Sequence, residues 1–292
     1  MQETIENKIN LRFSQPLKTN DINFHIIIIG AGGTGGYLIP NLSRFIASLP
    51  SNEENFKNHI ITIVDGDKVE EKNIIRQNFI TQDIGRYKAE VLAERYSQAF
   101  GIELNAYTEY IETEDELDYI LNLCNFHVPI IVGCVDNNKT RQLIHKAFFK
   151  MNRLIFWLDG GNEEFSGQVV LGSNYYYKHL KEEHFNPSIP LRVFLSPVTM
   201  LYPDILEDQD SKFNSELSCA ENAISAPQSI TANLTSANII MNFLTQIMSA
   251  TNDEGIKTHY VKFNTKNNVI TTQMIYKEDV LSNIKAAENY FE

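Results

Sequence analysis

The sequence predicts an α/β fold in which helices cover both faces of a mostly parallel sheet. Three observations lead to this prediction. Short apolar runs of strand length alternate with longer segments whose apolar residues have helical spacing. A glycine-rich turn joins the first such strand to the first helix. Near the end of the chain, "THYVKFN" and "NVITTQMIY" alternate as strands and predict a C-terminal antiparallel extension.

The expected strands lie mainly in the first half of the chain. Buried strands are predicted at Phe24–Ile29, His59–Val64, Pro129–Val135 and Arg153–Gly161, and "IELNAYTEYI" alternates as a further strand.

Helices are expected between these strands. "GYLIPNLSRFIASL" has helical spacing, with Pro40 placed in its first turn, where the missing N–H costs little. "GRYKAEVLAERYSQAFG" predicts a helix that stops at Gly101. "PQSITANLTSANIIMNFLTQIMS" predicts a long late helix, and a short helix is expected from Lys277.

This pattern divides the chain into four parts. Residues 1–23 form an N-terminal extension, and 24–172 form the core. Residues 173–226 have little periodicity, which is typical of a functional or disordered loop, and we expect them to be a crossover region over the substrate. Residues 227–292 complete the same domain with a helix and a hairpin.

Composition excludes several classes of protein. The 292 residues carry 37 acidic and 25 basic side chains, a formal charge of −12, which argues against a nucleic-acid surface. No apolar run reaches the ~18–20 residues of a membrane span, and no signal-peptide pattern opens the chain. Cys124, Cys134 and Cys219 form no CxxC pair, so we expect neither a disulfide framework nor zinc, and a cytoplasmic location.

The glycine-rich turn indicates a Rossmann-like nucleotide site. Gly30, Gly32 and Gly35 satisfy G-x-G-x-x-G between a strand and a helix, where helix N-terminal amides favour a phosphate. Asp65 ends the second strand, where a carboxylate can accept both ribose hydroxyls. Adenosine and phosphates are common to NAD and ATP, so this motif leaves both nucleotides open.

Polar residues further along favour ATP. Asn73, Arg76 and Gln77 follow the ribose carboxylate, and Lys88 begins the next helix. Arginine binds phosphate with two donors and lysine offers a compact charge, which suits a departing pyrophosphate. The alternative is that Arg76 and Lys88 are ordinary solvated charges.

A further carboxylate predicts a magnesium site. Asp136 stands just past a buried strand, at the edge of the sheet where ligands bind in open α/β folds. Mg²⁺ prefers one or two carboxylates together with phosphates and waters. Asp136 could instead cap the next helix, although Asn137 or Asn138 could take that role.

These ordered motifs resemble the ThiF/MoeB superfamily, the adenylation fold of enzymes that activate ubiquitin-like proteins. The resemblance covers roughly residues 24–172. "RQNF", "GRYKAEVLAERY" and the late "SC…PQ…N" most resemble the ThiF-family protein of bacterial PRTRC-type plasmid cassettes. In the superfamily the matching residues bind ATP and carry the catalytic charges, with Mg²⁺ on Asp136; here they are Gly30, Gly32, Gly33, Gly35, Asp65, Asp67, Asn73, Arg76, Gln77, Lys88, Asp136 and Asn137.

The chain departs from the superfamily pattern at two points. The paired CxxC motifs are absent, so no zinc is expected, and the usual N-terminal Arg-x-x-Arg-Gln is missing. We hypothesise that Arg12 takes the role of that arginine, which enters the partner's site in dimeric members.

Cys219 precedes the late helix, where short members of the superfamily carry their acyl-accepting thiol, although some relatives stop at the adenylate. Cys124 and Cys134 are expected to be packing residues.

The resemblance therefore implies ATP- and Mg-dependent adenylation of the C-terminal carboxylate of a ubiquitin-like protein ending in Gly. A thioester on Cys219, a homodimer and a conjugating enzyme as a further partner belong to the same expectation. Adenylation of a short peptide would use the same site. An NAD-dependent oxidoreductase and a catalytically inactive scaffold of the same fold are the alternatives from other classes.

Overall fold

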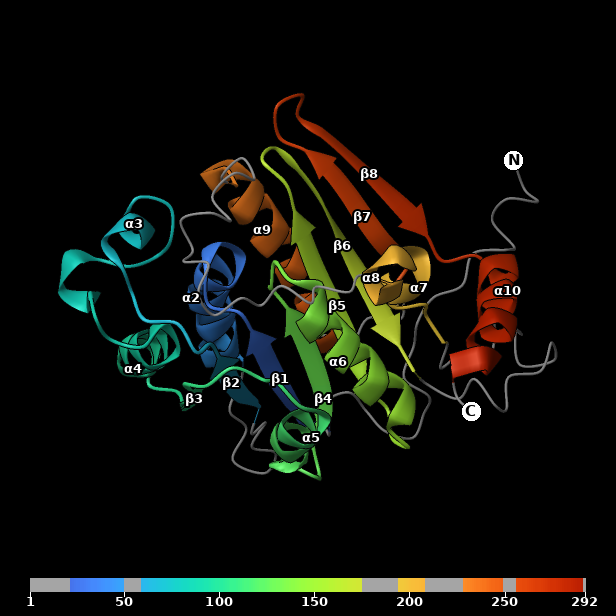
Figure 1. The fold of residues 1–292 in the computed structure, drawn as a ribbon, viewed down its shortest axis with the longest axis horizontal. Helices are drawn as coiled ribbons and strands as arrows, with labels where there is room; N and C mark the ends of the chain where they lie inside the picture. Colours follow the sequence, from blue (N-terminus) through green and yellow to red (C-terminus); the bar gives the residue numbers. More distant parts are fainter. Residues whose placement is uncertain (1–21, 50–58, 175–193, 208–227, 249–255, 291–292) are drawn as a thin grey trace.

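The computed structural model contains one eight-stranded sheet in the order β3-β2-β1-β4-β5-β6-β7-β8 (Figure 1). It describes residues 22–49, 59–174, 194–207, 228–248 and 256–290. The strands are β1 Phe24–Ile29, β2 Ile60–Val64, β3 Leu104–Tyr107, β4 Val128–Gly133, β5 Phe156–Asn162, β6 Ser166–Ser173, β7 Thr258–Asn264 and β8 Val269–Met274.

The sheet has a parallel half and an antiparallel half. β1 pairs in parallel with β2 on one side and with β4 on the other, and β3 and β5 continue the two sides in parallel. From β5 to β8 every pairing is antiparallel. The predicted fold class, a mostly parallel sheet with an antiparallel C-terminal extension, is confirmed.

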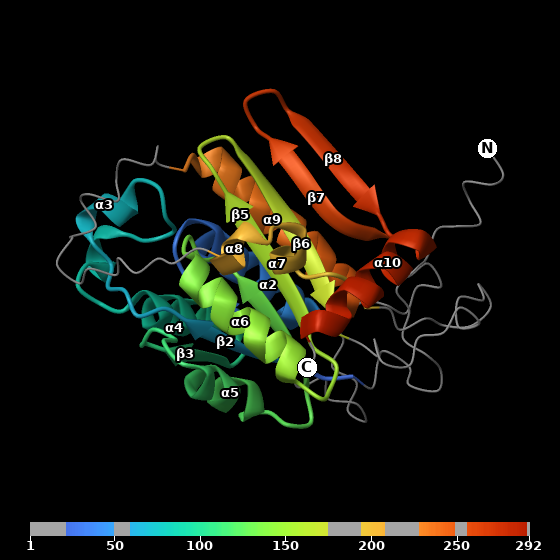
Figure 2. The same cartoon turned by 45° about the vertical axis from the view of Figure 1, so that its right-hand side comes forward.

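Helices cover both faces of the sheet, and α2 and α9 pack together on one face (Figures 1 and 2). α5 and α6 lie together on the opposite face. The helices are α2 Gly33–Ser48, α3 Glu71–Ile74, η2 Thr81–Asp83, α4 Lys88–Phe100, α5 Glu114–Asn122, α6 Asn138–Lys150, α7 Val198–Leu201, α8 Asp204–Glu207, α9 Ile230–Met248, α10 Lys277–Ala287 and η6 Glu288–Tyr290. None of these described helices is long and apolar enough to span a bilayer.

The core lies along the central strands. All six residues of β1 are buried, as expected for a parallel strand covered on both faces. The long late helix, the terminal hairpin and the helix from Lys277 all form as predicted. β6 was not predicted as a separate strand, and β3 is shorter than "IELNAYTEYI" suggested.

The placement of Pro40 was wrong. α2 begins at Gly33, so Pro40 lies in the helix interior and cannot donate the usual hydrogen bond to the carbonyl of Gly36. The side-chain amide of Asn78 donates to that carbonyl instead, at 2.9 Å. Asn78, which lies 38 positions after Pro40, thus replaces the missing backbone donor. This replacement makes the interior proline tolerable.

Candidate functional site

The glycine loop follows β1 and lies where the strand order reverses. After β1 the chain adds β2 and β3 on one side, and it then crosses to β4 on the other side. Gly30 has φ of 97°, and a Cβ there would come within 2.6 Å of the carbonyl oxygen of Cys134. A Cβ on Gly35 would lie 1.9 Å from the carbonyl oxygen of Gly30. Neither position can carry a side chain without moving the backbone. The loop therefore presents main chain to the crevice at which open α/β sheets bind ligands.

Asp65 is fixed against this loop. Its Oδ2 accepts a hydrogen bond from the backbone N–H of Ala31 at 2.6 Å, and its Oδ1 accepts one from Asp67 at 2.8 Å. Burial raises the pKa of Asp65, while the nearby Lys88 ammonium opposes that rise. Each carboxylate oxygen retains a lone pair beyond these two bonds, so the group can still accept ribose hydroxyls.

Lys88 is held by Asp67. Its Nζ is 2.7 Å from Asp67 Oδ2, and the Lys88 side chain is only 7% exposed. The hydroxyl of Tyr110 donates to the other oxygen of Asp67. Burial by itself would raise the pKa of Asp67, but the Lys88 ammonium and the Tyr110 hydroxyl together lower it. Lys88 thus already has a counterion, and its predicted phosphate contact stays a prediction.

Asn73, Arg76 and Gln77 differ in their surroundings. Asn73 is buried and caps the short helix α3, accepting from the backbone N–H of Glu70 at 2.8 Å. Gln77 Nε2 lies 3.6 Å from the position that a Cβ on Gly32 would take, and Gln77 Oε1 is buried with no hydrogen-bond partner among the described residues. The partly exposed Arg76 guanidinium has no hydrogen bond or ion pair with any described residue. Gln77 therefore lies against the glycine loop, while the guanidinium of the preceding Arg76 is unengaged within the described part of the chain.

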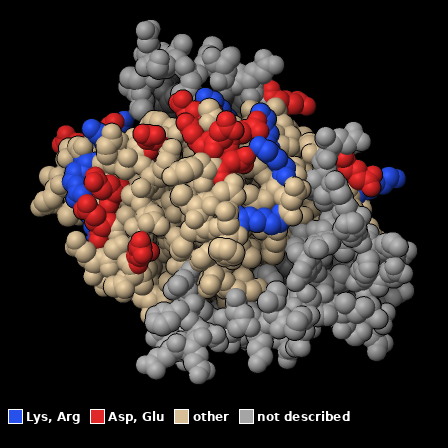
Figure 3. Space-filling view, turned by 90° about the horizontal axis from the view of Figure 1, so that it is seen from below, with Lys and Arg blue, Asp and Glu red and all other residues tan. Residues whose placement is uncertain are grey.

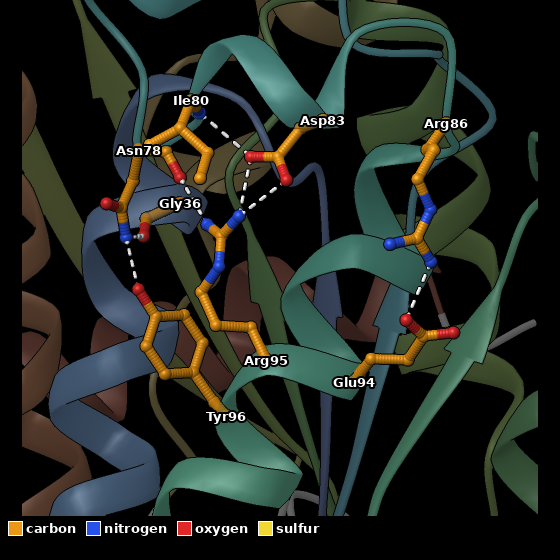
Figure 4. A network of polar contacts seen from close by, with 8 residues as sticks. All are labelled: Gly36, Asn78, Ile80, Asp83, Arg86, Glu94, Arg95 and Tyr96. Carbon is orange, nitrogen blue, oxygen red and sulfur yellow. Dashed lines mark hydrogen bonds and ion pairs between the residues drawn. The ribbon is translucent and has the colours of Figure 1, made fainter.

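A polar network holds the segment that carries Arg76 and Gln77 (Figure 4). Arg95 on α4 binds both oxygens of Asp83, at 2.6 and 2.5 Å, and donates to the carbonyl of Asn78 at 3.2 Å. The Asn78 amide also donates to the hydroxyl of Tyr96 at 2.7 Å. α4 and α2 are thereby joined through the segment between them. The spacing of these residues along the chain does not predict that they meet.

The turn after β4 leaves Asp136 open. Asn137 caps α6, since its Oδ1 accepts from the backbone N–H of Thr140 at 2.8 Å. Asp136 is exposed, and no described residue bonds to its carboxylate. Asn137 thus takes the capping role, which was the alternative for Asp136.

Behind this turn lies a buried ion pair that the sequence pattern did not predict. Arg141 Nε is 3.1 Å from both oxygens of Asp159, and Arg141 Nη2 donates to the carbonyl of Val135 at 2.7 Å. Burial raises the pKa of Asp159, and the Arg141 guanidinium opposes this. The pair fixes the backbone immediately before Asp136. The segment "WLDGG" predicts only a buried strand, and nothing in its pattern indicates that Asp159 forms an ion pair.

The surroundings of Asp136 fit a nucleotide-bound magnesium ion. The described residues contain no group of three or more His, Cys, Asp or Glu side chains able to enclose a metal. Mg²⁺, however, usually binds through one or two carboxylates plus phosphates and waters. One open carboxylate, two residues after Cys134, whose carbonyl oxygen lies against Gly30 of the glycine loop, meets that requirement.

A second polar cluster was also unexpected. Asn162 at the end of β5 donates to Thr34 Oγ1 at 2.7 Å and to Asn233 Oδ1 at 3.2 Å. Asn162 thereby joins the end of β5 to the first turn of α2 and to α9. Asn162 Oδ1 is buried without a partner among the described residues.

Of the two described cysteines, Cys134 packs against the core, whereas Cys124 is half-buried and its expected packing role stays a prediction. Cys134 follows β4 directly, and burial together with the Asp159 charge raises its pKa. Burial likewise raises the pKa of Cys124. Cys219 and Arg12 lie outside the described residues, so their predicted roles stay predictions.

Comparisons with known proteins agree with this geometry. The sequence model of the ThiF family matches residues 7–280. The chain is 28% identical over 160 residues to the NEDD8-activating enzyme E1 catalytic subunit of Dictyostelium discoideum, covering 50% of this chain and 32% of that protein. It is 29% identical over 140 residues to the tRNA threonylcarbamoyladenosine dehydratase of Haemophilus influenzae, covering 47% of each.

Solved structures support the fold. The E. coli MccB structure with AMPCPP and MccA superposes with a TM-score of 0.56 at 13% identity, covering 88% of this chain and 65% of that one. The chain thus spans half or less of the curated relatives above and about two thirds of this neighbour.

Proposed function

Because the chain belongs to the ThiF family, we propose that it uses ATP to adenylate a carboxylate, specifically the C-terminal carboxylate of a ubiquitin-like protein. The narrower resemblance to PRTRC-cassette proteins stays a prediction.

The observation that carries this proposal is that Gln77 lies against the glycine loop and is preceded along the chain by Arg76, whose guanidinium no described residue binds. Gln77 lies against Gly32, and Arg76 keeps its guanidinium free of any described partner. Arginine matches phosphate oxygens with two donors, and a fixed guanidinium at the phosphates suits a reaction that expels pyrophosphate. A dinucleotide that is only held gains nothing comparable, which disfavours NAD.

The reaction follows from this arrangement. An oxygen of the substrate carboxylate attacks the α-phosphorus of ATP, and the bond from that phosphorus to the bridging oxygen of pyrophosphate breaks. The acyl adenylate forms, and pyrophosphate leaves with the bonding electrons. Asp65 positions the ribose, while Arg76 offsets the charge that grows on the leaving group. Asp136 is the residue that would hold Mg²⁺, which supplies further neutralisation of the phosphates.

The names of the relatives suggest the class of substrate. One relative is named for NEDD8, and MccB was solved with MccA, so both a small protein and a peptide are supported as substrates. A tRNA, named in the other relative, suits this chain less well because of its formal charge of −12. A conjugating enzyme as a further partner, a homodimer and Arg12 as its cross-site arginine remain parts of the proposal.

Ligand binding separates the proposal from its rivals. ATP with Mg²⁺ should raise the melting temperature, whereas NAD should not. Stabilisation by NAD alone would favour the oxidoreductase, and stabilisation by neither nucleotide would favour the inactive scaffold.

Catalysis is tested by ATP–pyrophosphate exchange with candidate small proteins and peptides that have a free C-terminus. Asp136→Ala should lower the exchange by about 100-fold or more, because it removes charge stabilisation while leaving the Asn137 cap intact. Glu103→Ala, which removes an exposed carboxylate on the α4–β3 turn, is the matched control. Equal exchange by both variants would contradict the assignment.

Thioester formation on Cys219 is tested separately on gels run without reductant. Cys219→Ala should lose a thiol-sensitive adduct and keep the exchange reaction. An adduct that persists in this variant would rule out Cys219 as the acceptor.

A further inference from the structure

Asn233, in the first turn of α9, lies directly on the glycine loop. The residue is only 2% exposed, and its Nδ2 lies 2.3 Å from the position that a Cβ on Gly33 would take. Gly33 is the first residue of α2, and α9 packs along that helix (Figure 1). A glycine is therefore needed at position 33 for α9 to bring this amide against the loop.

The two polar atoms of the Asn233 amide are used unequally. Its Oδ1 accepts from Thr34 Oγ1 at 3.3 Å and from Asn162 Nδ2 at 3.2 Å. Its Nδ2 is left against Gly33 and donates to no described residue. A buried donor without an acceptor is costly in a folded protein, and an oxygen of a bound ligand would remove that cost.

The position of this donor indicates which ligand it serves. A helix that begins directly after a glycine-rich loop favours a phosphate at its N-terminus. Gln77 lies against Gly32, so two side-chain amides lie against successive glycines of the loop, and both glycines are partly exposed. An anionic oxygen bound at this loop is the acceptor that the Asn233 donor lacks.

The surface charge of the protein makes such donors necessary. The chain has a formal charge of −12, and the face shown in Figure 3 carries acidic and basic side chains beside one another. A phosphate therefore depends on donors within the site rather than on a basic surface. We propose that Asn233 donates from Nδ2 to a phosphate oxygen of bound ATP. This inference rests on the proposed use of ATP, and it adds a residue of α9 to a site built from the first half of the chain.

Asn233→Asp tests the donor directly. Aspartate keeps the shape of the side chain and an oxygen for the bonds from Thr34 and Asn162, but it puts a second oxygen where the donor was. ATP with Mg²⁺ should bind about tenfold or more weakly in calorimetric titrations without any carboxylate substrate. Adenosine, which has no phosphate, should bind as it does to the wild type. Asn238→Asp introduces the same charge at an exposed position of α9 and is the matched control, with unchanged ATP affinity.

Asn233→Ala separates hydrogen bonding from packing. It removes the donor without adding a charge, so it should weaken ATP binding less than Asn233→Asp does and leave adenosine binding unchanged. A packing role predicts the opposite order, because alanine leaves a cavity and aspartate does not. The comparison of ATP with adenosine in Asn233→Ala is a sufficient test by itself if Asn233→Asp does not fold.

Three results would overturn this inference and leave the proposed function standing. They are unchanged ATP affinity in the Asn233 variants, an equal loss of ATP and adenosine affinity, and a loss confined to the KM of the carboxylate substrate in ATP–pyrophosphate exchange. The last result would mean that Nδ2 binds the substrate instead of the nucleotide. Absence of ATP binding by the wild type would overturn the proposed function itself, and this inference with it.

Discussion

Two regions next to β1 handle charge differently. The segment from Asp65 to Lys88 follows β2, and its Asp65, Asp67 and Lys88 side chains are tied to one another or to backbone amides. The turn from Val135 to Arg141 follows β4, and it keeps its ion pair behind the backbone while Asp136 stays open. Each region nevertheless also contains an open charge, because Arg76 in the first and the Asp136 carboxylate in the second have no bond to a described residue.

The largest expected effect comes from removing the ion pair that lies behind the turn from Val135 to Arg141. Asp159→Ala should lower the free energy of unfolding by about 3–5 kcal/mol, because Arg141 would remain buried without its counterion. Urea denaturation measures this loss. Lys146→Ala, which removes an exposed ion pair on the same helix, is the control and should change stability far less. Similar losses in the two variants would mean that the buried pair does not support the turn.

Arg76 tests whether the free charges act in catalysis. Arg76→Ala should lower ATP–pyrophosphate exchange by about 100-fold without loss of stability, since no described residue bonds to its guanidinium. Arg76→Lys should recover only part of the rate, because lysine cannot bind phosphate with two parallel donors. Full activity of the alanine variant would make Arg76 an ordinary surface charge.

Asn78 and Pro40 test how the first region is supported. Asn78→Ala should cost about 1–2 kcal/mol of unfolding free energy, because the carbonyl of Gly36 loses its only side-chain donor among the described residues. Pro40→Ala restores a backbone N–H at the position that normally bonds that carbonyl. The double variant should therefore be more stable than the two single changes predict. Strict additivity in a double-mutant cycle would contradict this account.

The smallest effect concerns the Asp67–Lys88 pair. Its partners hold the pKa of Asp67 below the ordinary value of 3.8. The folded protein therefore releases this proton more readily than the unfolded chain, and the pair stabilises the fold fully above pH ~4. That stabilisation is lost as the pH falls from 3.8 through the lower pKa of the folded state. The stability difference between wild type and Asp67→Asn should shrink across that range, and a constant difference would contradict the pairing.

Local sequence patterns predicted most of the fold. Runs such as Phe24–Ile29, the spacing of apolar residues in α4 and the glycine loop identified the elements, because strand and helix periodicities are local properties. The helix start at Lys88 was readable for the same reason, whereas the sequence left the cap of α6 open among Asp136, Asn137 and Asn138. The order of chemical groups along the chain also placed Asp65, Arg76 and Asp136 at the ends of strands or in the loops that follow them.

Contacts between distant residues were decided by the tertiary structure alone. The sequence determined which residues could bind a nucleotide, but not that Lys88 would be paired with Asp67 while Arg76 stayed free. It could not show that Asn78 completes the helix at Pro40, or that Asp159 and Arg141 meet behind Asp136. These pairs join separate strands and helices, and their distances depend on how the layers pack. Periodicity and spacing describe one element at a time, so they carry no information about such distances.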